Sequence, residues 1–506
     1  MKLRNFLIVP ACLLFALFSC KKDWLDVNTN PNSLPSSTPD YTFAAAANRI
    51  AATLGPNELG EYWSGHWTQS ATYILSATIF KYEYNNTNFD YWSGYYDILE
   101  DLDYAAKGAT GTLAYFGGTA RVLKAYTYQI MVDLYGNIPY TDALKGSNSL
   151  APKFDDQKAI YEDLIKVLDT AITILKANPL PPNAVGSDIV FGSGGAATAA
   201  TKWIQFANSL KLRILIRQSR VAGREAYITA EINKAAATTE GFLPAGLDVT
   251  SSPGYIASAG KLNPFYENWG YTSTGLNVST GRYIRPTEFL FTSLKAAKDT
   301  FRMKRLAWPN GGEGLLPEII TNYTGVPFGD GGSTWLSQVT SYIGPSQIQS
   351  GDFARPMILM TNAESQFLLA EAKQRYAGVT LPLTAQAYYE QGVKEAFRIT
   401  GTAASAATTL LTSGIDLSDW TASPDKLKAI WMQKWLALTN YSGFEAWCEY
   451  RKNNFPVTPA SASTATNAPR PVRLFYPSGE VASNGENVKA QGTIDVFTTR
   501  LFWDVD

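Results

Sequence analysis

Apolar residues after Asp40 recur at intervals of three and four, which is the period of an amphipathic α-helix. In the segment 119–134 the residues on one such face are Leu123, Tyr126, Ile130 and Leu134. A second set, which follows Asp155 or Asp156 as a helix cap, is Ile160, Leu164, Leu168, Ala171 and Leu175, and a third is Trp203, Phe206, Leu210 and Ile214. The pattern predicts three amphipathic helices that face a common core.

The chain changes character at about residue 241, where Gly, Pro, Ser, Thr and Asn dominate up to residue 351 and only 286–298 favours a helix. Helical patterns resume at Thr361, which forms a capping-box pattern with Glu364, and continue through 385–398 and 424–438. The prediction is a mainly α protein, with tetratricopeptide-like helical hairpins as a scaffold and a large loop-rich insertion. Its predicted parts are 41–240 and 352–506 for the scaffold, the latter with a loop-rich tail, and 241–351 for the insertion.

The N-terminus has the layout of a secretory signal, with Lys2 and Arg4 before an apolar run that ends at Phe18. Thirteen residues at about 1.5 Å each are too short to cross a roughly 30 Å hydrocarbon core. The run ends in Leu-Phe-Ser before Cys20, which resembles the bacterial lipoprotein box. We therefore predict a signal peptide over 1–19, acylation of Cys20, and a polar tether over 20–40. The alternative is a simple secretory signal in which the cysteine is accidental.

Composition narrows the possible partners and cofactors. The net charge is −1, from 43 basic and 44 acidic residues without a basic run, which argues against nucleic acid as a partner. Of three cysteines, Cys12 lies in the signal and Cys20 is the proposed anchor, so Cys448 is predicted to be a buried, unpaired thiol.

Motifs for catalysis are scarce. The single histidine, His66, excludes a zinc site built on two histidines, and no phosphate-binding loop or Gly-x-Ser-x-Gly motif occurs. We predict a structural role for His66, no metal, no cofactor and no enzymatic activity. A glycoside hydrolase stays open as an alternative, since it needs only two carboxylates at the right distance. An acidic cluster that we interpret as a solvated helix face consists of Asp97, Glu100, Asp101 and Asp103.

Several separated segments together resemble the SusD/RagB family of outer-membrane lipoproteins. In order along the chain they are 24–31 (Trp-Leu-Asp-Val-Asn-Thr-Asn-Pro), 133–143 (Asp-Leu-Tyr-Gly-Asn-Ile-Pro-Tyr-Thr-Asp-Ala), 202–213 (with Ala-Asn-Ser-Leu before Lys-Leu-Arg), 364–372 (ending Ala-Glu-Ala), 443–451 (with Gly-Phe-Glu-Ala-Trp) and 473–484 (beginning Arg-Leu-Phe-Tyr-Pro). We predict that these motif residues define the fold and do not contact ligand. Asn208 and Arg213 are expected to bond backbone carbonyls between helices, and Glu445 is expected to pair with Arg451.

The resemblance implies a lipid-anchored protein on the outside of the bacterial outer membrane, in which the loop-rich insertion 241–351 is the ligand-binding region. It implies as partner a SusC-like TonB-dependent barrel that the lipoprotein covers like a lid. The ligand would be an oligosaccharide or polysaccharide nutrient, or an oligopeptide in another member of the family. A cell-surface glycoside hydrolase and an adhesin-like structural lipoprotein remain as alternatives from other functional classes.

Ligand contacts are predicted where aromatic residues stand in polar, glycine-rich surroundings, because such residues are poorer core candidates than those on apolar helix faces. The candidate residues are Trp67, Tyr73, Tyr82, Tyr266, Trp269, Tyr271, Tyr283 and Arg285. Trp67 and Trp269 are predicted to be stacking platforms for sugar rings. Ordinary packing is the alternative for each of them.

Overall fold

The computed structural model describes residues 37–55, 58–313, 320–464 and 468–505. The chain separates into two compact units, Met1–Thr38 and Pro39–Asp506, and of the first unit only Ser37 and Thr38 are described. The predicted signal peptide, the proposed anchor Cys20 and most of the predicted tether lie outside the described residues. No helix within the described ranges is both long enough and apolar enough to cross a membrane.

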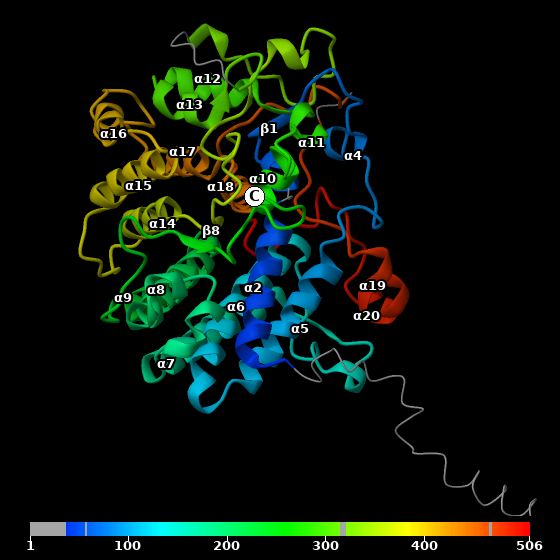
Figure 1. Ribbon diagram of the computed structural model, residues 1–506, viewed down its shortest axis with the longest axis vertical. Coiled ribbons are helices and arrows are strands. Elements are labelled where there is room, and N and C mark those ends of the chain that lie inside the picture. Colours follow the sequence, from blue (N-terminus) through cyan, green and yellow to red (C-terminus); the bar gives the residue numbers. More distant parts are fainter. Residues whose placement is uncertain (1–36, 56–57, 314–319, 465–467, 506) are drawn as a thin grey trace, which may run out of the picture. The chain divides into compact units, whose positions relative to one another are not determined.

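The helices of the first half of the second unit are α2 (Pro39–Leu54), α3 (Leu59–Trp63), α4 (Ala77–Phe80), α5 (Trp92–Gly108), α6 (Ala114–Tyr135), α7 (Gln157–Ala177), α8 (Ala196–Arg217) and α9 (Glu225–Ala236). Six of them pack as successive neighbours, in the order α2, α5, α6, α7, α8 and α9 (Figure 1). The three predicted amphipathic segments are α6, α7 and α8. Asp156, and not Asp155, caps α7, since its carboxylate accepts from the N–H groups of Lys158 and Ala159 at 3.0 Å.

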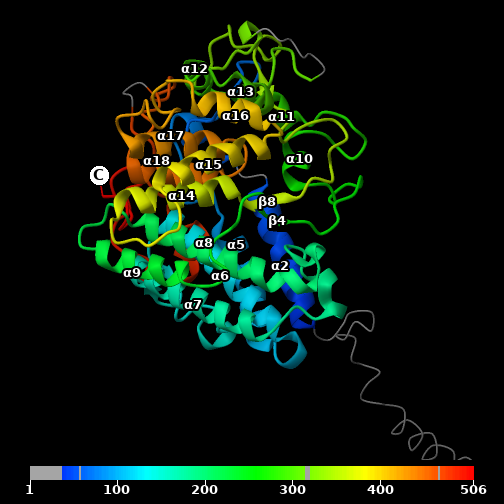
Figure 2. The ribbon, with the colours of Figure 1, turned by 90° about the vertical axis from the view of Figure 1, so that its left-hand side faces the viewer.

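The second half of the scaffold lies beside α8, with α14 packed on α15 (Figure 2). Its helices are α14 (Asn362–Arg375), α15 (Ala385–Ile399), α16 (Ala404–Leu411), α17 (Lys426–Leu438), α18 (Gly443–Asn453), α19 (Ser478–Ser483) and α20 (Gly485–Lys489). The first half of the predicted capping box is confirmed, because the N–H of Glu364 donates to Thr361 Oγ1 at 3.1 Å, whereas the Glu364 carboxylate binds Arg213. The predicted mainly α, tetratricopeptide-like scaffold is therefore confirmed.

Short elements occupy the region predicted to be loop-rich. The helices are α10 (Pro264–Trp269), α11 (Ser279–Tyr283), α12 (Glu288–Ala296) and α13 (Thr300–Leu306). The strands of the unit are β1 (Trp67–Gln69), β2 (Ile138–Pro139), β3 (Phe154–Asp155), β4 (Val249–Ser251), β5 (Ile284–Pro286), β6 (Ala307–Trp308), β7 (Tyr342–Ile343) and β8 (Met357–Met360). They form the antiparallel pairs β1–β5, β2–β3, β4–β8 and β6–β7. The β1–β5 and β4–β8 pairs connect this region to the scaffold, whereas α12 and α13 lie at the end away from α7 (Figures 1 and 2).

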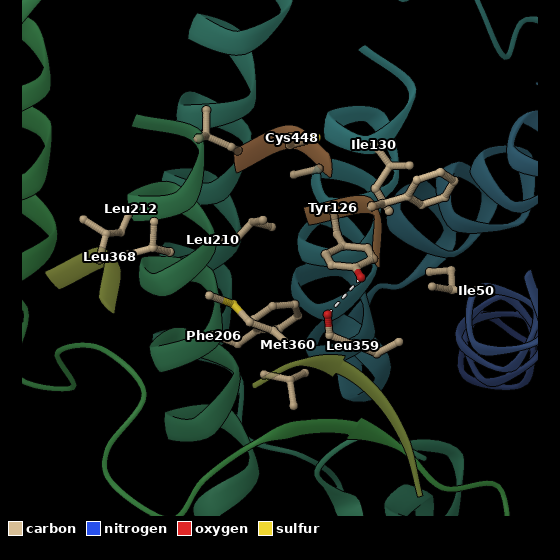
Figure 3. Packing of buried hydrophobic residues seen from close by; sticks show 14 of the residues in the cluster. Ile50, Tyr126, Ile130, Phe206, Leu210, Leu212, Leu359, Met360, Leu368 and Cys448 are labelled. Carbon is tan, nitrogen blue, oxygen red and sulfur yellow. Dashed lines mark hydrogen bonds between the residues drawn. The ribbon is translucent and has the colours of Figure 1, made fainter. Parts of the chain in front are cut away.

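The apolar core fills the space between α6, α8 and β8 (Figure 3). Tyr126 and Phe206 are buried there, and the Tyr126 hydroxyl donates to the carbonyl of Leu359 at 2.9 Å. This bond satisfies a polar group that would otherwise be buried without a partner. Cys448 is buried beside them, as predicted, and burial raises the pKa of its thiol to about 12.

Charged residues, six of nine from the motif segments, form a buried ion network at the centre of the scaffold. Its members are Asp133, Arg213, Arg217, Glu364, Glu371, Lys434, Glu445, Glu449 and Lys452. Arg213 forms a bidentate pair with Glu364, at 2.7 and 2.8 Å, which joins α8 to α14. Every member is at most 5% exposed as a residue, so these motif residues define the fold, as predicted.

Two expected pairings in this network are wrong in detail. Arg213 binds the carboxylate of Glu364 and not a backbone carbonyl, whereas Asn208 does donate to the carbonyl of Gly241, at 2.7 Å. Glu445 pairs with Arg213 and Arg217, and Arg451 instead donates to two backbone carbonyls. The cause is helix geometry: residues 213 and 217 lie one turn apart on α8, so both guanidinium groups face α18.

Candidate ligand-binding site

A cavity of about 740 Å³ lies next to the β1–β5 pair. One wall is the loop after β1, with Thr72 and Tyr73, and the remaining walls come from the segment 269–350. The cavity thus joins both aromatic segments that the sequence singled out. Its size is within the roughly 300–1,000 Å³ range of small-ligand sites.

Two tryptophans give the cavity fixed apolar walls. The indole N–H of Trp269 donates to the carbonyl of Gly55 at 3.0 Å, and that of Trp308 donates to the carbonyl of Ile348 at 2.9 Å. Both residues are largely buried, at 4% and 7% exposed, so only a small part of each ring reaches the cavity. These bonds hold the rings in one orientation, and a ligand does not have to order them.

Three half-buried tyrosines complete the aromatic lining: Tyr73, Tyr271 and Tyr342. Tyr73 packs edge-on against Tyr283, with ring centres 5.6 Å apart. Tyr271 donates its hydroxyl to Glu313, whose other carboxylate oxygen accepts from the N–H of Ser350 at 2.8 Å. The cavity therefore offers flat apolar faces with polar edges, the combination that suits sugar rings.

Polar side chains with unused bonding capacity lie between the rings. Arg282 is exposed at the cavity, and its guanidinium has no hydrogen-bond or ion-pair partner within the described part of the chain. Asn277 and Gln338 line the cavity as well, and their amide N–H groups have no partner among the described residues. Such groups are free to bond ligand hydroxyl, amide or carboxylate groups.

The structure brings part of the predicted set together at this cavity. Tyr73, Trp269 and Tyr271 line it directly. Tyr283 is half-buried behind Tyr73, and burial raises the pKa of its hydroxyl to about 12. The choice of segments therefore agrees with the position of the cavity, and we propose that these residues contact ligand.

Four residues of the predicted set do not line this cavity, which corrects their prediction as contacts within it: Trp67, Tyr82, Tyr266 and Arg285. All four are buried, at 0% exposed for Trp67 and Arg285, 2% for Tyr266 and 5% for Tyr82. Trp67 packs on Trp269 at 5.5 Å and donates its indole N–H to Asn440 at 2.8 Å. The reason is strand pairing, because β1 pairs with β5 and thereby places Trp67 and Arg285 in the interior.

Sequence reasoning missed Trp308, Tyr342 and Arg282 as individual residues. All three lie within the predicted ligand-binding region, and Trp308 precedes the run Pro-Asn-Gly-Gly at 309–312. This is the same signal, an aromatic residue in glycine-rich surroundings, that selected Trp269. Tyr342 carried no such signal, because its role depends on the β6–β7 pair.

Catalytic candidates lie away from the cavity. His66 is fully buried between Glu61, at 2.8 Å from Nδ1, and the carbonyl of Trp435, at 3.0 Å from Nε2, which confirms its predicted structural role. The acidic cluster on α5 is partly neutralised, since Asp97 and Asp101 both pair with Arg49. No group of three His, Cys, Asp or Glu side chains suited to a metal ion occurs among the described residues.

Residues 31–477 match the family model of SusD-like proteins, described as starch-binding and associating with the outer membrane. The chain belongs to the SusD-like family. This confirms the resemblance that the motif segments carried. No curated protein matches the chain.

Solved structures of SusD homologues share the fold of this SusD-like chain. A chitin-binding homologue from Flavobacterium johnsoniae has a TM-score of 0.71 at 23% identity, over 92% of this chain and 99% of its own. A homologue from Bacteroides uniformis has a TM-score of 0.73 at 22% identity, over 92% of this chain and 100% of its own. A protein described only as chitin-binding has a TM-score of 0.73 at 21% identity, over 93% of this chain and 100% of its own. At these identities the likeness establishes the fold and not the ligand.

Proposed function

We propose that this chain is a lipid-anchored outer-membrane protein that binds an oligosaccharide and delivers it to a SusC-like TonB-dependent barrel. The observation that carries the proposal is the cavity of about 740 Å³, with fixed tryptophan walls, tyrosine faces and unpaired amide groups. Aromatic faces cover the apolar side of a sugar ring, and amide and guanidinium groups bond its hydroxyls. Two of the structural relatives are described as chitin-binding, and the family is described as starch-binding.

The cavity favours a binding role over hydrolysis. Glu313 is the one carboxylate among the described residues that line it, and both of its oxygens accept hydrogen bonds. The usual glycosidase mechanism needs two carboxylates that flank the scissile bond. The second candidate is an oligopeptide ligand, because aromatic and amide groups also suit an extended peptide.

Titration of the full chain with maltoheptaose, chitohexaose and a set of peptides, together with a glycan array, tests the proposal. Saturable binding of an oligosaccharide without turnover supports it. Turnover that disappears in Glu313→Gln would show a hydrolase instead. Binding of peptides alone would select the oligopeptide alternative.

Tyr73→Ala is expected to weaken oligosaccharide binding by about 1–3 kcal/mol, or roughly 5- to 150-fold in Kd, because it removes one aromatic face of the cavity. Calorimetric titration of the tightest oligosaccharide ligand measures the change. Tyr41→Ala is the matched control, since Tyr41 is 65% exposed at the start of α2 and does not line the cavity. Equal affinity in wild type and Tyr73→Ala would place the ligand elsewhere.

A further inference from the structure

The lining of the candidate cavity carries a positive charge that no carboxylate of the described residues pairs with. Arg282 is exposed in the lining, and no described residue pairs with its guanidinium. A guanidinium presents its N–H groups in a planar fork that fits a carboxylate or a sulfate, whereas a neutral hydroxyl uses only one of them. Arg282 is therefore poorly explained by neutral sugars alone.

A second arginine lies behind the lining. The guanidinium carbon of Arg285 is 3.7 Å from the ring centre of Tyr342, and Arg285 is 0% exposed. Because Arg285 does not itself line the cavity, it lies against the covered side of that ring. It bonds Thr340 Oγ1, at 2.9 Å, and the carbonyl of Ile284, while its second Nη atom has no partner.

No carboxylate of the described residues pairs with Arg285, and burial lowers the pKa of its guanidinium to about 10. A buried cation without a counter-ion is unusual, because the loss of hydration is not offset by an ion pair. An anion at the adjacent cavity would supply the missing opposite charge.

Glu313 is the remaining charged group of the lining, and its oxygens are engaged by Tyr271 and by the N–H of Ser350. These two hydrogen bonds stabilise the negative charge of Glu313 at the cavity wall. Arg282 in the lining and Arg285 behind it carry two positive charges, against the single negative charge of Glu313. The cavity therefore has a net positive balance, although the whole chain carries −1.

We infer that the cavity selects an anionic oligosaccharide, one that carries carboxylate or sulfate groups, and that Arg282 is the residue that recognises the charge. The inference rests on the proposed function and names its ligand class. In this arrangement a sugar ring lies on the tyrosine faces while its acidic group bonds the Arg282 guanidinium. Arg285 does not touch the ligand. It packs behind the ring of Tyr342, and its positive charge attracts the acidic group electrostatically.

Four oligosaccharides of similar length test the inference by calorimetric titration of the full chain: hexagalacturonate for carboxylate, a κ-carrageenan hexasaccharide for sulfate, and maltoheptaose and chitohexaose as neutral probes. At least one charged probe is expected to bind tenfold or more tighter than either neutral probe. Raising NaCl from 50 to 500 mM is expected to reduce that preference, because salt screens the exposed Arg282. The charged probe that binds identifies which acidic group the cavity prefers.

Arg282→Gln is expected to weaken binding of the charged probe by about tenfold or more, the usual size of a lost charge-assisted hydrogen bond. Arg282→Lys is expected to recover part of the loss, because it keeps the charge and loses the planar fork. Lys158→Gln is the matched control, since it removes one exposed positive charge from α7, outside the cavity. Both positions are exposed, so the variants are expected to fold as wild type does.

The outcomes separate this inference from the proposed function. Neutral probes that bind as tightly as charged ones, or an Arg282→Gln variant with unchanged affinity, overturn the inference and leave glycan binding standing. Failure of all four oligosaccharides, together with an empty glycan array, overturns the proposed function itself. A preference for acidic peptides over every oligosaccharide overturns both.

Discussion

Replacing Glu445 by leucine is expected to lower the free energy of unfolding by about 3–5 kcal/mol, the typical cost of removing one partner from a buried ion pair. Glu445 lies on α18 and is 4% exposed, and its carboxylate pairs with Arg213, at 3.5 Å, and with Arg217. The variant leaves part of the positive charge of α8 buried without a counter-ion. Urea unfolding of the purified protein, followed by circular dichroism, measures the change.

The control for this variant is an exposed ion pair in the same scaffold. Asp97 is 64% exposed at its side chain and pairs with Arg49 at 3.2 Å. Asp97→Ala is expected to change the free energy of unfolding by less than about 1 kcal/mol, because solvent screens such pairs. A Glu445→Leu protein as stable as Asp97→Ala would show that the network contributes little to stability.

The pKa of Glu445 predicts that the free energy of unfolding depends on pH. Burial alone would raise the pKa of Glu445, but Arg213 and Arg217 lower it from 4.5 to about 2. A depressed pKa in the folded state means that the stabilisation is present above about pH 4.5 and is lost as the pH falls towards 2. Wild type is thus expected to lose stability over this window faster than Glu445→Leu. Parallel slopes of unfolding free energy against pH in the two proteins would contradict this.

Local patterns were sufficient to predict the helices of the scaffold. The period of three to four apolar residues in 119–134 is a property of one segment, and α6 contains that segment as a single helix. Thr361 likewise caps α14 through a bond to a residue three positions away. These features need no knowledge of distant contacts, so the sequence alone reveals them.

Pairings between distant segments were not accessible in this way. Glu445 was expected to pair with Arg451, which is near in sequence, but its partners Arg213 and Arg217 are more than two hundred residues away. Trp67 looked exposed from its polar neighbours, yet β1 pairs with β5, more than two hundred residues later, and this pairing buries it. Composition selected a segment that contains most of the cavity lining, but only tertiary contacts decide which ring of that segment faces the cavity.

Cys20→Ala is expected to abolish retention of the protein at the membrane and uptake of its ligand, while folding and ligand affinity stay unchanged. Each buried methylene of an acyl chain contributes about 0.8 kcal/mol, so several chains on one cysteine hold a large domain at the membrane firmly. No helix within the described ranges is long and apolar enough to replace that anchor. Cell fractionation and uptake of a labelled oligosaccharide measure the two losses.

Cys448→Ala is the matched control, because it removes the other cysteine of the predicted mature chain without affecting the lipoprotein box. Cys448 is 2% exposed in the core, so its replacement is expected to leave the protein at the membrane. Comparing Cys20→Ala with Cys448→Ala separates the effect of losing the anchor from the effect of replacing a cysteine in the folded domain. If the protein only captures its ligand, as proposed, import requires that the anchor hold it beside a transporter. Normal uptake by cells that carry Cys20→Ala would show that capture and import are not coupled through the anchor.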